Sequence, residues 1–521
     1  MSKYSVIIKN GEVFDGKGNE PQRVDIGISG DEIKEMGDLQ KEAAAEVIDA
    51  GGKYVSPGFI DLTNHSDVRW TLFTHPSQES LVAQGVTTIL GGNCGSSLAP
   101  FLGESSAKEI NRWIDVSKIN INWRTMEGFF LEMEKHKLGV NFGTFVGFNT
   151  VCQTAPGNKE ELKDIKFLLK LSLDQGAFGV STSFGAPGHK TFTDEEIVDI
   201  FKKIGGEDVL TKHHLEDEGE NILPSTSRLV GIARKSSVKL HFSHFKALGR
   251  SSWKFFPGAM NMAKNARAEG VQLTYDFFPY TKTGSSLIML LPAWFRKLPV
   301  KEAKEILTSK EDKKRRALKD YLNKITLHYG NIIVASAANE FGVVGKTIED
   351  IGKSSGNSGE ETVLSLLEVN DLRVSVFNEA ISEENINMLA TDEFSAVSTD
   401  GVGYGILSAD EADLPHPRSF GTFPRAIDMF AKKKILDWKN LIYKMAGLPA
   451  NILGIKDRGV IAENNKADIV IFDPVKVSDN ATYAKPFQFP NGVEFVFVNG
   501  KAVLNGGKLT KELPGSILRK K

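Results

Sequence analysis

Eight short apolar runs recur through the middle of this 521-residue chain, and segments with helical patterns separate them. The runs are residues 58–65, 86–93, 141–148, 178–183, 208–214, 238–244, 271–277 and 394–400. Strands that alternate with helices build α/β folds with a parallel sheet. Eight such units are the count of a (β/α)8, or TIM-like, barrel, whose active site lies at the carboxyl ends of the strands. An open doubly wound sheet is the main alternative.

The segments between the runs support helices. Leu162, Ile165 and Leu169 fall on one face of 160–174, which is the spacing of an amphipathic helix. Thr193 precedes three acidic residues and can act as an N-cap.

Both ends of the chain have a different pattern, with short strand-like runs joined by Gly and Asn turns. The runs are 5–8, 24–28, 46–48, 467–472 and 493–498. Asn10–Gly11 is a hairpin signal, and Asn499–Gly500 is a turn. Two β-rich ends around an α/β middle predict one small β-sandwich built from both termini. We therefore predict a sandwich domain of residues 1–56 plus 450–521 and a barrel of residues 57–449.

The connection between the seventh and eighth predicted strands is far longer than a barrel crossover needs. It includes the basic, helix-prone segment 300–327. We expect an inserted subdomain at about residues 288–390, in a position to cover the site.

The charge balance argues against large polyanionic partners. The formal net charge is −2, so neither nucleic acid nor an anionic membrane is favoured. Only Cys94 and Cys152 are present, which argues against a disulfide framework. The first residues lack the apolar core of a signal peptide, and no apolar run is long enough to cross a bilayer. We expect a cytoplasmic enzyme, although secretion by another route stays open.

Five of the eight predicted strands end in a group that can bind a metal. These groups are His65, Cys94, the pair His213–His214, His244 and Asp400. A single strand-end histidine is more often structural, and a single Asp-Gly is more often a turn. Their joint placement at one face of a barrel, in a chain with ten histidines, indicates a metal site.

A thiolate with two imidazoles is a typical ligand set for Zn²⁺, and a catalytic zinc keeps one position for water. Bound zinc lowers the pKa of that water from 15.7 to about 7. A nearby carboxylate can take the proton and pass it to a leaving amine. Asp400 is the only strand-end carboxylate in the set suited to this role. The leading interpretation is a hydrolytic zinc site, and another divalent ion remains an alternative.

Short motifs run in a recognisable order through nearly the whole chain. They are PGFID (57–61), GVTT (85–88), GNCG (92–95), GAFGVST (176–182), HLEDEG (214–219), SHFK (243–246), PYT (279–281), STDG (398–401), HPR (416–418) and GTFPR (421–425). On these motifs the chain resembles the D-aminoacylase (N-acyl-D-amino-acid deacylase) family of the amidohydrolase superfamily. The tail, with RGVI (458–461) and AD (467–468), is similar to the small β domain of that superfamily.

The resemblance implies roles for individual residues. It implies one tight zinc ion on Cys94, His214 and His244, with Asp400 as the catalytic acid/base. It also implies substrate contacts from Lys246, Tyr280, Ser286 and Arg418. A guanidinium can hold a carboxylate at two points, so Arg418 is the candidate for the amino-acid carboxylate; an ordinary interdomain ion pair is the alternative.

The chain also departs from the family pattern. The family carries His-X-His after the first strand, but here the positions are Thr63, Asn64 and His65. Because Thr63 is a weak zinc ligand, we do not expect a well-formed second metal site on His65 and Asp400. Phe148 and Cys152 stand where the family tends to have a histidine and an arginine, which questions the usual substrate profile.

Two further histidines need assignment. Neighbours on a strand point to opposite faces, so only one of His213 and His214 can face the barrel interior. The resemblance selects His214. We expect His241 to be structural or to support a ligand.

The favoured function is a zinc-dependent amidohydrolase that cleaves the N-acyl amide bond of small N-acyl amino acids, with the D configuration preferred. Cyclic amides, dipeptides and N-carbamoyl compounds are alternative substrates of the same scaffold. Two functions of a different class stay open: a non-catalytic scaffold, and a thiol hydrolase with Cys94 as nucleophile. Metal content separates both of them from a zinc enzyme.

Overall fold

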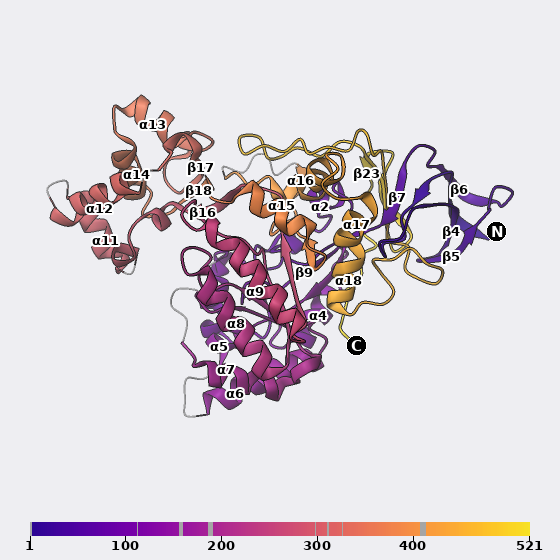
Figure 1. Cartoon of the computed structure of the whole chain (residues 1–521), viewed down its shortest axis with the longest axis horizontal. Coiled ribbons are helices and arrows are strands. Elements are labelled where there is room, and N and C mark those ends of the chain that lie inside the picture. Colours follow the sequence, from indigo (N-terminus) through magenta and orange to yellow (C-terminus); the bar gives the residue numbers. More distant parts are fainter. Residues whose placement is uncertain are drawn as a thin grey trace.

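The structure of the protein is a computed structural model that describes residues 3–111, 113–155, 160–185, 191–296, 298–309, 312–325, 327–406 and 413–521. It has three parts (Figure 1). A barrel with its helices lies in the middle, a β-rich part that contains the N-terminus lies on the right, and a small α/β part lies on the left.

Parallel strands form the barrel. Their bounds are β8 (Phe59–Asp61), β9 (Val86–Gly91), β10 (Asn141–Thr144), β11 (Val146–Gly147), β12 (Val180–Ser183), β13 (Leu210–His214), β14 (Lys239–Phe242), β15 (Leu273–Phe277) and β19 (Ser395–Val397). Only Phe145 separates β10 from β11, so these two make one strand. Each neighbouring pair is parallel, and a parallel bridge from Asn64 to Gly401 joins the last strand to the first. Every predicted run contains one of these strands, and the (β/α)8 fold is confirmed.

Amphipathic helices cover the outside of the barrel. They include α6 (Glu161–Asp174), α7 (Asp194–Ile204), α8 (Ile222–Ser236), α9 (Phe256–Ala268) and α15 (Glu383–Thr391). Ile165 and Leu169 on the predicted face of α6 are fully buried. Thr193 caps α7 together with Glu196 in a capping box. The local signals at 160–174 and at Thr193 therefore predicted α6 and α7 correctly.

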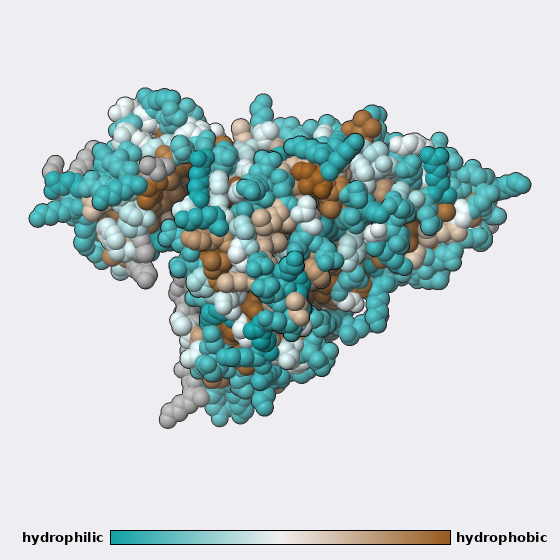
Figure 2. All heavy atoms as spheres, in the orientation of Figure 1, coloured by the Kyte–Doolittle hydropathy of each residue, from teal (hydrophilic) through white to brown (hydrophobic). Residues whose placement is uncertain are grey.

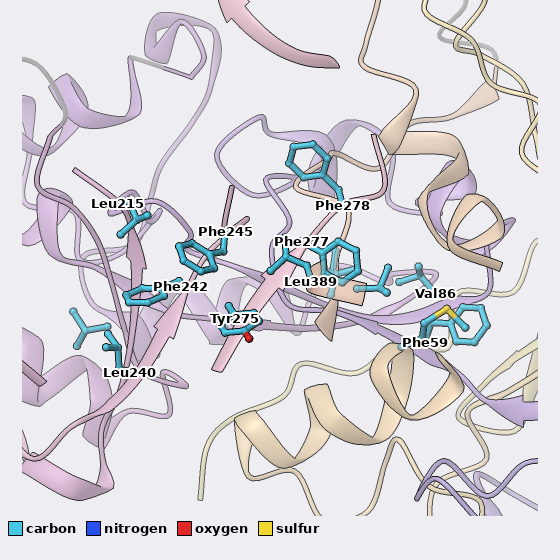
Figure 3. Packing of buried hydrophobic residues seen from close by; sticks show 14 of the residues in the cluster. Phe59, Val86, Leu215, Leu240, Phe242, Phe245, Tyr275, Phe277, Phe278 and Leu389 are labelled. Atoms are coloured by element: carbon cyan, nitrogen blue, oxygen red, sulfur yellow. The ribbon is translucent and has the colours of Figure 1, made fainter. Parts of the chain in front are cut away.

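Aromatic side chains fill the space between strands and helices (Figure 3). The ring centroids of Phe242 and Phe245 are 5.1 Å apart, and those of Phe245 and Tyr275 are 5.4 Å apart. All three side chains are buried. Burial of a side chain of this size stabilises the fold by about 1.5–3 kcal/mol, so this packing holds β14 and β15 against α9.

Both chain ends join in two facing sheets. The first sheet has the order β5 (Glu32–Gly37), β4 (Asp25–Ser29), β1 (Tyr4–Lys9), β6 (Ala44–Asp49). The second has the order β23 (Lys508–Leu509), β22 (Lys501–Asn505), β21 (Val493–Val498), β20 (Ile469–Phe472), β7 (Tyr54–Pro57), β2 (Glu12–Val13), β3 (Gln22–Arg23). Val6 and Ile28 of the first sheet share one apolar cluster with Val55 and Ile471 of the second. The domain limits at residues 56 and 450 stay predictions.

The hairpin predicted at Asn10–Gly11 is wrong. Asn499–Gly500 joins β21 to β22 as an antiparallel hairpin. Asn10–Gly11 does not make a hairpin, because β1 pairs with β4 and β6 whereas β2 pairs with β3 and β7. The turn carries the chain from one sheet to the other. Asn10 has a φ of 64°, so the local turn chemistry was read correctly while its tertiary use was not.

The long connection folds as a separate unit. An antiparallel sheet of β16 (Lys282–Ser286), β18 (Val374–Glu379) and β17 (Ile333–Ala337) packs with α11 (Val300–Thr308), α12 (Lys313–Lys324), α13 (Ile348–Ser355) and α14 (Gly359–Val369). Its apolar cluster is distinct from that of the barrel. The sheet begins at Lys282, earlier than expected, and α15 packs with the barrel rather than with the insertion.

Hydrophilic residues predominate on the face shown in Figure 2, where hydrophobic residues form small separate patches. Within the described ranges, no helix combines the length and the apolar character that a membrane span requires.

Candidate metal centre

Three of the predicted metal ligands come together at the carboxyl ends of the strands. Cys94 follows β9, His214 ends β13, and His244 follows β14. Each offers one ligand atom, and the three atoms lie within 4.8 Å of one another. Cys94 Sγ is 3.4 Å from His244 Nε2, and the rings of His214 and His244 have centroids 4.5 Å apart.

A second group shares the same thiol. His65, Cys94 and Asp400 also place one ligand atom each within 4.8 Å of one another. His65 Nε2 lies 3.0 Å from Asp400 Oδ1. The carboxylate predicted as acid/base therefore lies directly beside the cysteine of the first group.

The backbone at this site is unusual for non-glycine residues. Cys94, His244 and Asp400 have φ values of 51°, 38° and 48°. Left-handed backbone is uncommon for such residues and often occurs at functional sites, where the surrounding structure enforces it. In each case the chain turns just after a strand, which aims the side chain into the shared space above the barrel.

The donor set fits a zinc ion. Burial opposes ionisation of the Cys94 thiol, but His244, His214 and His65 hold the pKa of Cys94 well below its usual value. The thiolate is the form that binds metal. His65 Nδ1 is buried and has no hydrogen-bond partner among the described residues. A thiolate and two imidazoles leave one tetrahedral position for water.

Arg418, the first residue of α16 (Arg418–Ala426), lies against the acid/base candidate. Its Nη1 is 2.7 Å from Asp400 Oδ2, but off the hydrogen-bonding direction. Its Nε and Nη1 are buried and find no hydrogen-bond acceptor in the described part of the chain. Arg418 lines a cavity of about 630 Å³ together with Asp400, His65 and Ser286. The cavity thus brings two predicted substrate residues to the carboxylate.

The other two predicted substrate residues lie apart from this cavity wall. Lys246 Nζ donates to Glu218 Oε1 at 2.7 Å and is buried. The Tyr280 hydroxyl donates to Asp479 Oδ2 at 3.0 Å. Burial and the Asp479 charge keep the pKa of Tyr280 well above its usual value, so the phenol stays protonated. Neither residue is among the described residues that line the cavity.

His213 and His241 lie outside the proposed ligand group. His213 Nδ1 lies 2.6 Å from Thr182 Oγ1, away from the ligand group. Burial lowers the pKa of His213 to about 3, which keeps the ring neutral. His241 Nε2 lies 2.9 Å from Asp276 Oδ2.

Sequence reasoning missed three charged residues beneath or beside the ligands. Lys212 and Asp276 form a buried ion pair of 3.1 Å, and Glu218 Oε1 lies 3.1 Å from His244 Nδ1. Burial opposes ionisation of Asp276, but Lys212 and His241 lower its pKa. One signal was present, because Asp276 lies near the end of a predicted strand, as Asp400 does.

Known proteins resemble the whole chain, although no family model matches it. An N-acyl-D-aspartate deacylase from Alcaligenes xylosoxydans xylosoxydans is 26% identical, over 98% of this chain and 94% of its own. A D-aminoacylase with a binuclear metal centre has a TM-score of 0.80 and 25% identity, over 99% of this chain and 100% of its own.

The same architecture appears in an N-acyl-D-glutamate deacylase from Bordetella bronchiseptica, complexed with zinc and a phosphonate that mimics the tetrahedral intermediate. It has a TM-score of 0.82 and 22% identity, over 99% of this chain and 100% of its own. Along its whole length the chain is therefore similar to D-aminoacylases and N-acyl-D-amino-acid deacylases. Its fold is the barrel that these proteins have.

Two departures from the D-aminoacylase pattern have structural consequences. The Thr63 hydroxyl donates to Asp276 Oδ2 at 2.6 Å, so position 63 serves the buried ion pair. Phe148, at the start of α5 (Phe148–Thr154), packs against Phe184 and Phe192 with centroids 5.6 and 5.5 Å away. An aromatic cluster therefore surrounds position 148, where the resemblance led us to expect a histidine.

Proposed function

We propose that this protein is a zinc-dependent amidohydrolase that cleaves the N-acyl amide bond of N-acyl amino acids, with D-configured substrates preferred. The observation that carries the proposal is the ligand group of Cys94, His214 and His244 with Asp400 beside it. The proposal is supported by an N-acyl-D-aspartate deacylase, a D-aminoacylase and an N-acyl-D-glutamate deacylase that are similar to this chain along nearly their whole length.

In this proposal Cys94, His214 and His244 hold the metal. A zinc ion, when bound, supplies an activated water and polarises a carbonyl. Burial opposes ionisation of Asp400, but Arg418, His244 and His65 hold its pKa well below the usual value, so it is a carboxylate. Asp400 can then accept the proton of the water and deliver it to the leaving amine.

The substrate carboxylate is assigned to Arg418. Its Nε and Nη1 have no hydrogen-bond acceptor among the described residues, Arg418 lines the cavity, and a guanidinium can bind a carboxylate at two points. Ser286, at the end of β16, brings the insertion to the same cavity. Roles for Lys246 and Tyr280 require these side chains to leave Glu218 and Asp479, respectively.

The proposal is tested by metal analysis of the purified protein and a substrate panel. We expect stoichiometric zinc and turnover of N-acyl-D-amino acids in preference to L enantiomers, cyclic imides, dipeptides and N-carbamoyl compounds. Asp400→Asn should reduce kcat by about 10²–10⁴-fold and keep its zinc. Near-normal turnover by Asp400→Asn contradicts the mechanism, and a metal-free active protein favours the thiol hydrolase.

We also propose a cytoplasmic location and a division into sandwich, barrel and insertion. The sequence has only two cysteines, which suits a reducing compartment. Fractionation of the native host tests the location.

A further inference from the structure

A buried lysine lies beneath the ligand group. Lys212, in β13, is 1% exposed, and its ammonium donates to Asn93 Oδ1 at 2.9 Å and Ser243 Oγ at 3.1 Å. It also donates to the Thr63 hydroxyl and pairs with Asp276 Oδ2 at 3.1 Å. These four partners come from or directly follow β8, β9, β14 and β15. One cation therefore joins five strand ends.

Asp276 completes this arrangement. Its Oδ1 accepts from the His244 backbone N–H at 2.6 Å, and its Oδ2 accepts from Thr63 at 2.6 Å and lies 2.9 Å from His241 Nε2. A buried ion pair is tolerated when further hydrogen bonds satisfy both groups, and these contacts meet that condition. We call Lys212, Asp276, Thr63, Asn93 and Ser243 the buried hub.

Each proposed zinc ligand is attached to this hub. Asn93 precedes Cys94, Lys212 is two residues before His214, and Ser243 precedes His244. Groups that orient metal ligands from behind typically change metal affinity when they are removed. The hub therefore restrains the backbone next to all three proposed ligands.

The groups that would bind a second metal ion already contact basic side chains of the protein. Thr63, where the family has the first histidine of His-X-His, is bonded to Lys212 and Asp276. Asp400 has His65 beside Oδ1 and Arg418 beside Oδ2. We propose that the Lys212 ammonium is a built-in cation that holds the three ligand-bearing strand ends in place and, with Arg418, keeps this centre mononuclear. This inference rests on the proposed zinc centre.

The test measures metal binding rather than activity. The apoprotein is titrated with Zn²⁺ and with Co²⁺, and bound metal is quantified by elemental analysis and by the Co²⁺ spectrum. We expect one tight equivalent in the wild-type protein even with excess metal. Lys212→Met should weaken metal binding by about tenfold or more. Lys444→Met is the matched control, because Lys444 is another buried lysine whose Nζ bonds Ser395 Oγ at 3.0 Å, outside the hub.

A second variant keeps the test decisive if Lys212→Met does not fold. Lys212→Met/Asp276→Asn removes both charges, so no single charge is left buried. We expect it to fold with a near-native circular dichroism spectrum and to bind metal at least about tenfold more weakly. Wild-type affinity in this folded variant, or two tight equivalents in the wild-type protein, would overturn the inference and leave the proposed function intact. A wild-type protein that binds no metal refutes the proposed function itself.

Discussion

At the scale of single residues, the contact between Arg418 and Asp400 suits two proposed roles of Arg418. The distance of 2.7 Å places a cation against the acid/base candidate, while Arg418 Nε and Nη1 lack hydrogen-bond partners in the described structure. A guanidinium in this state can stabilise Asp400 before a substrate enters and bind its carboxylate afterwards. The family resemblance and the chemistry of a guanidinium indicated the second role, and the geometry suggests the first.

Arg418→Met should weaken recognition of the carboxylate. We expect kcat/KM for an N-acyl-D-amino acid to fall by about 10- to 100-fold, because a charge-assisted hydrogen bond contributes about 1.5–3 kcal/mol. The control is the same substrate with a carboxamide in place of the carboxylate. The wild-type protein should prefer the acid strongly and the variant should not. An unchanged acid-to-amide ratio contradicts the assignment.

At this scale the sequence and its family resemblance indicated the proposed ligands but not the residues that support them. Cys94, His214 and His244 each end a predicted strand, and chemistry limits which side chains bind zinc. Lys212 and Asp276 lie inside their predicted strands, where a charged residue carries no local sign of its partner. Their pairing depends on which inward positions face each other across the barrel.

At the scale of elements, the end of β9 controls the position of Cys94. Gly92 has a φ of 69°, and a Cβ built there would lie 2.0 Å from the Phe145 carbonyl oxygen. The turn therefore needs glycine both for its backbone conformation and for the close approach of the neighbouring strand.

Gly92→Ala should destabilise the protein by about 3 kcal/mol or more and reduce its zinc content, because the left-handed conformation and the clash both oppose an added methyl group. Denaturant unfolding and elemental analysis measure the two effects. Gly249→Ala is the matched control, since Gly249 has a φ of 86° and no atom within 4 Å of the added Cβ. Its expected cost is about 1–2 kcal/mol without loss of zinc. Equal stability of the two variants would show that the close approach is unimportant.

The elements of the barrel were predictable because each strand is a short apolar run bounded by turn residues. The turn at Asn10–Gly11 was misread because a hairpin and a crossing between two sheets share the same local backbone. The limits of the insertion differed because β16 continues directly from the loop after β15, and no composition change marks that point.

At the scale of the whole molecule, the proposed metal ligands connect segments that are far apart in the chain. A ligand that binds only the native state stabilises that state against unfolding. The stabilisation is about 2.7 kcal/mol when the free ligand concentration is about 100 times Kd. Chelation should therefore lower Tm and abolish turnover, and added zinc should restore both. Calorimetry with and without chelator measures the shift.

Cys94→Ser serves as the control, because it lacks the thiolate and should show little change of Tm on chelation. An equal Tm for the wild-type protein with and without chelator would contradict a structural contribution from the metal. Full turnover after complete metal removal would contradict the zinc mechanism.

By itself the sequence determined the barrel, the β-rich ends and the kinds of metal-binding groups at the strand ends. Strand periodicity is local, and the carboxyl ends of parallel strands must meet at one face. Only the tertiary structure decided that Lys212 pairs with Asp276, that Arg418 lies against Asp400, and that Lys246 is held by Glu218. These pairings depend on distances between segments that are remote in the chain. A buried charge without a partner is strongly destabilising, so each of these buried charges lies beside an opposite charge.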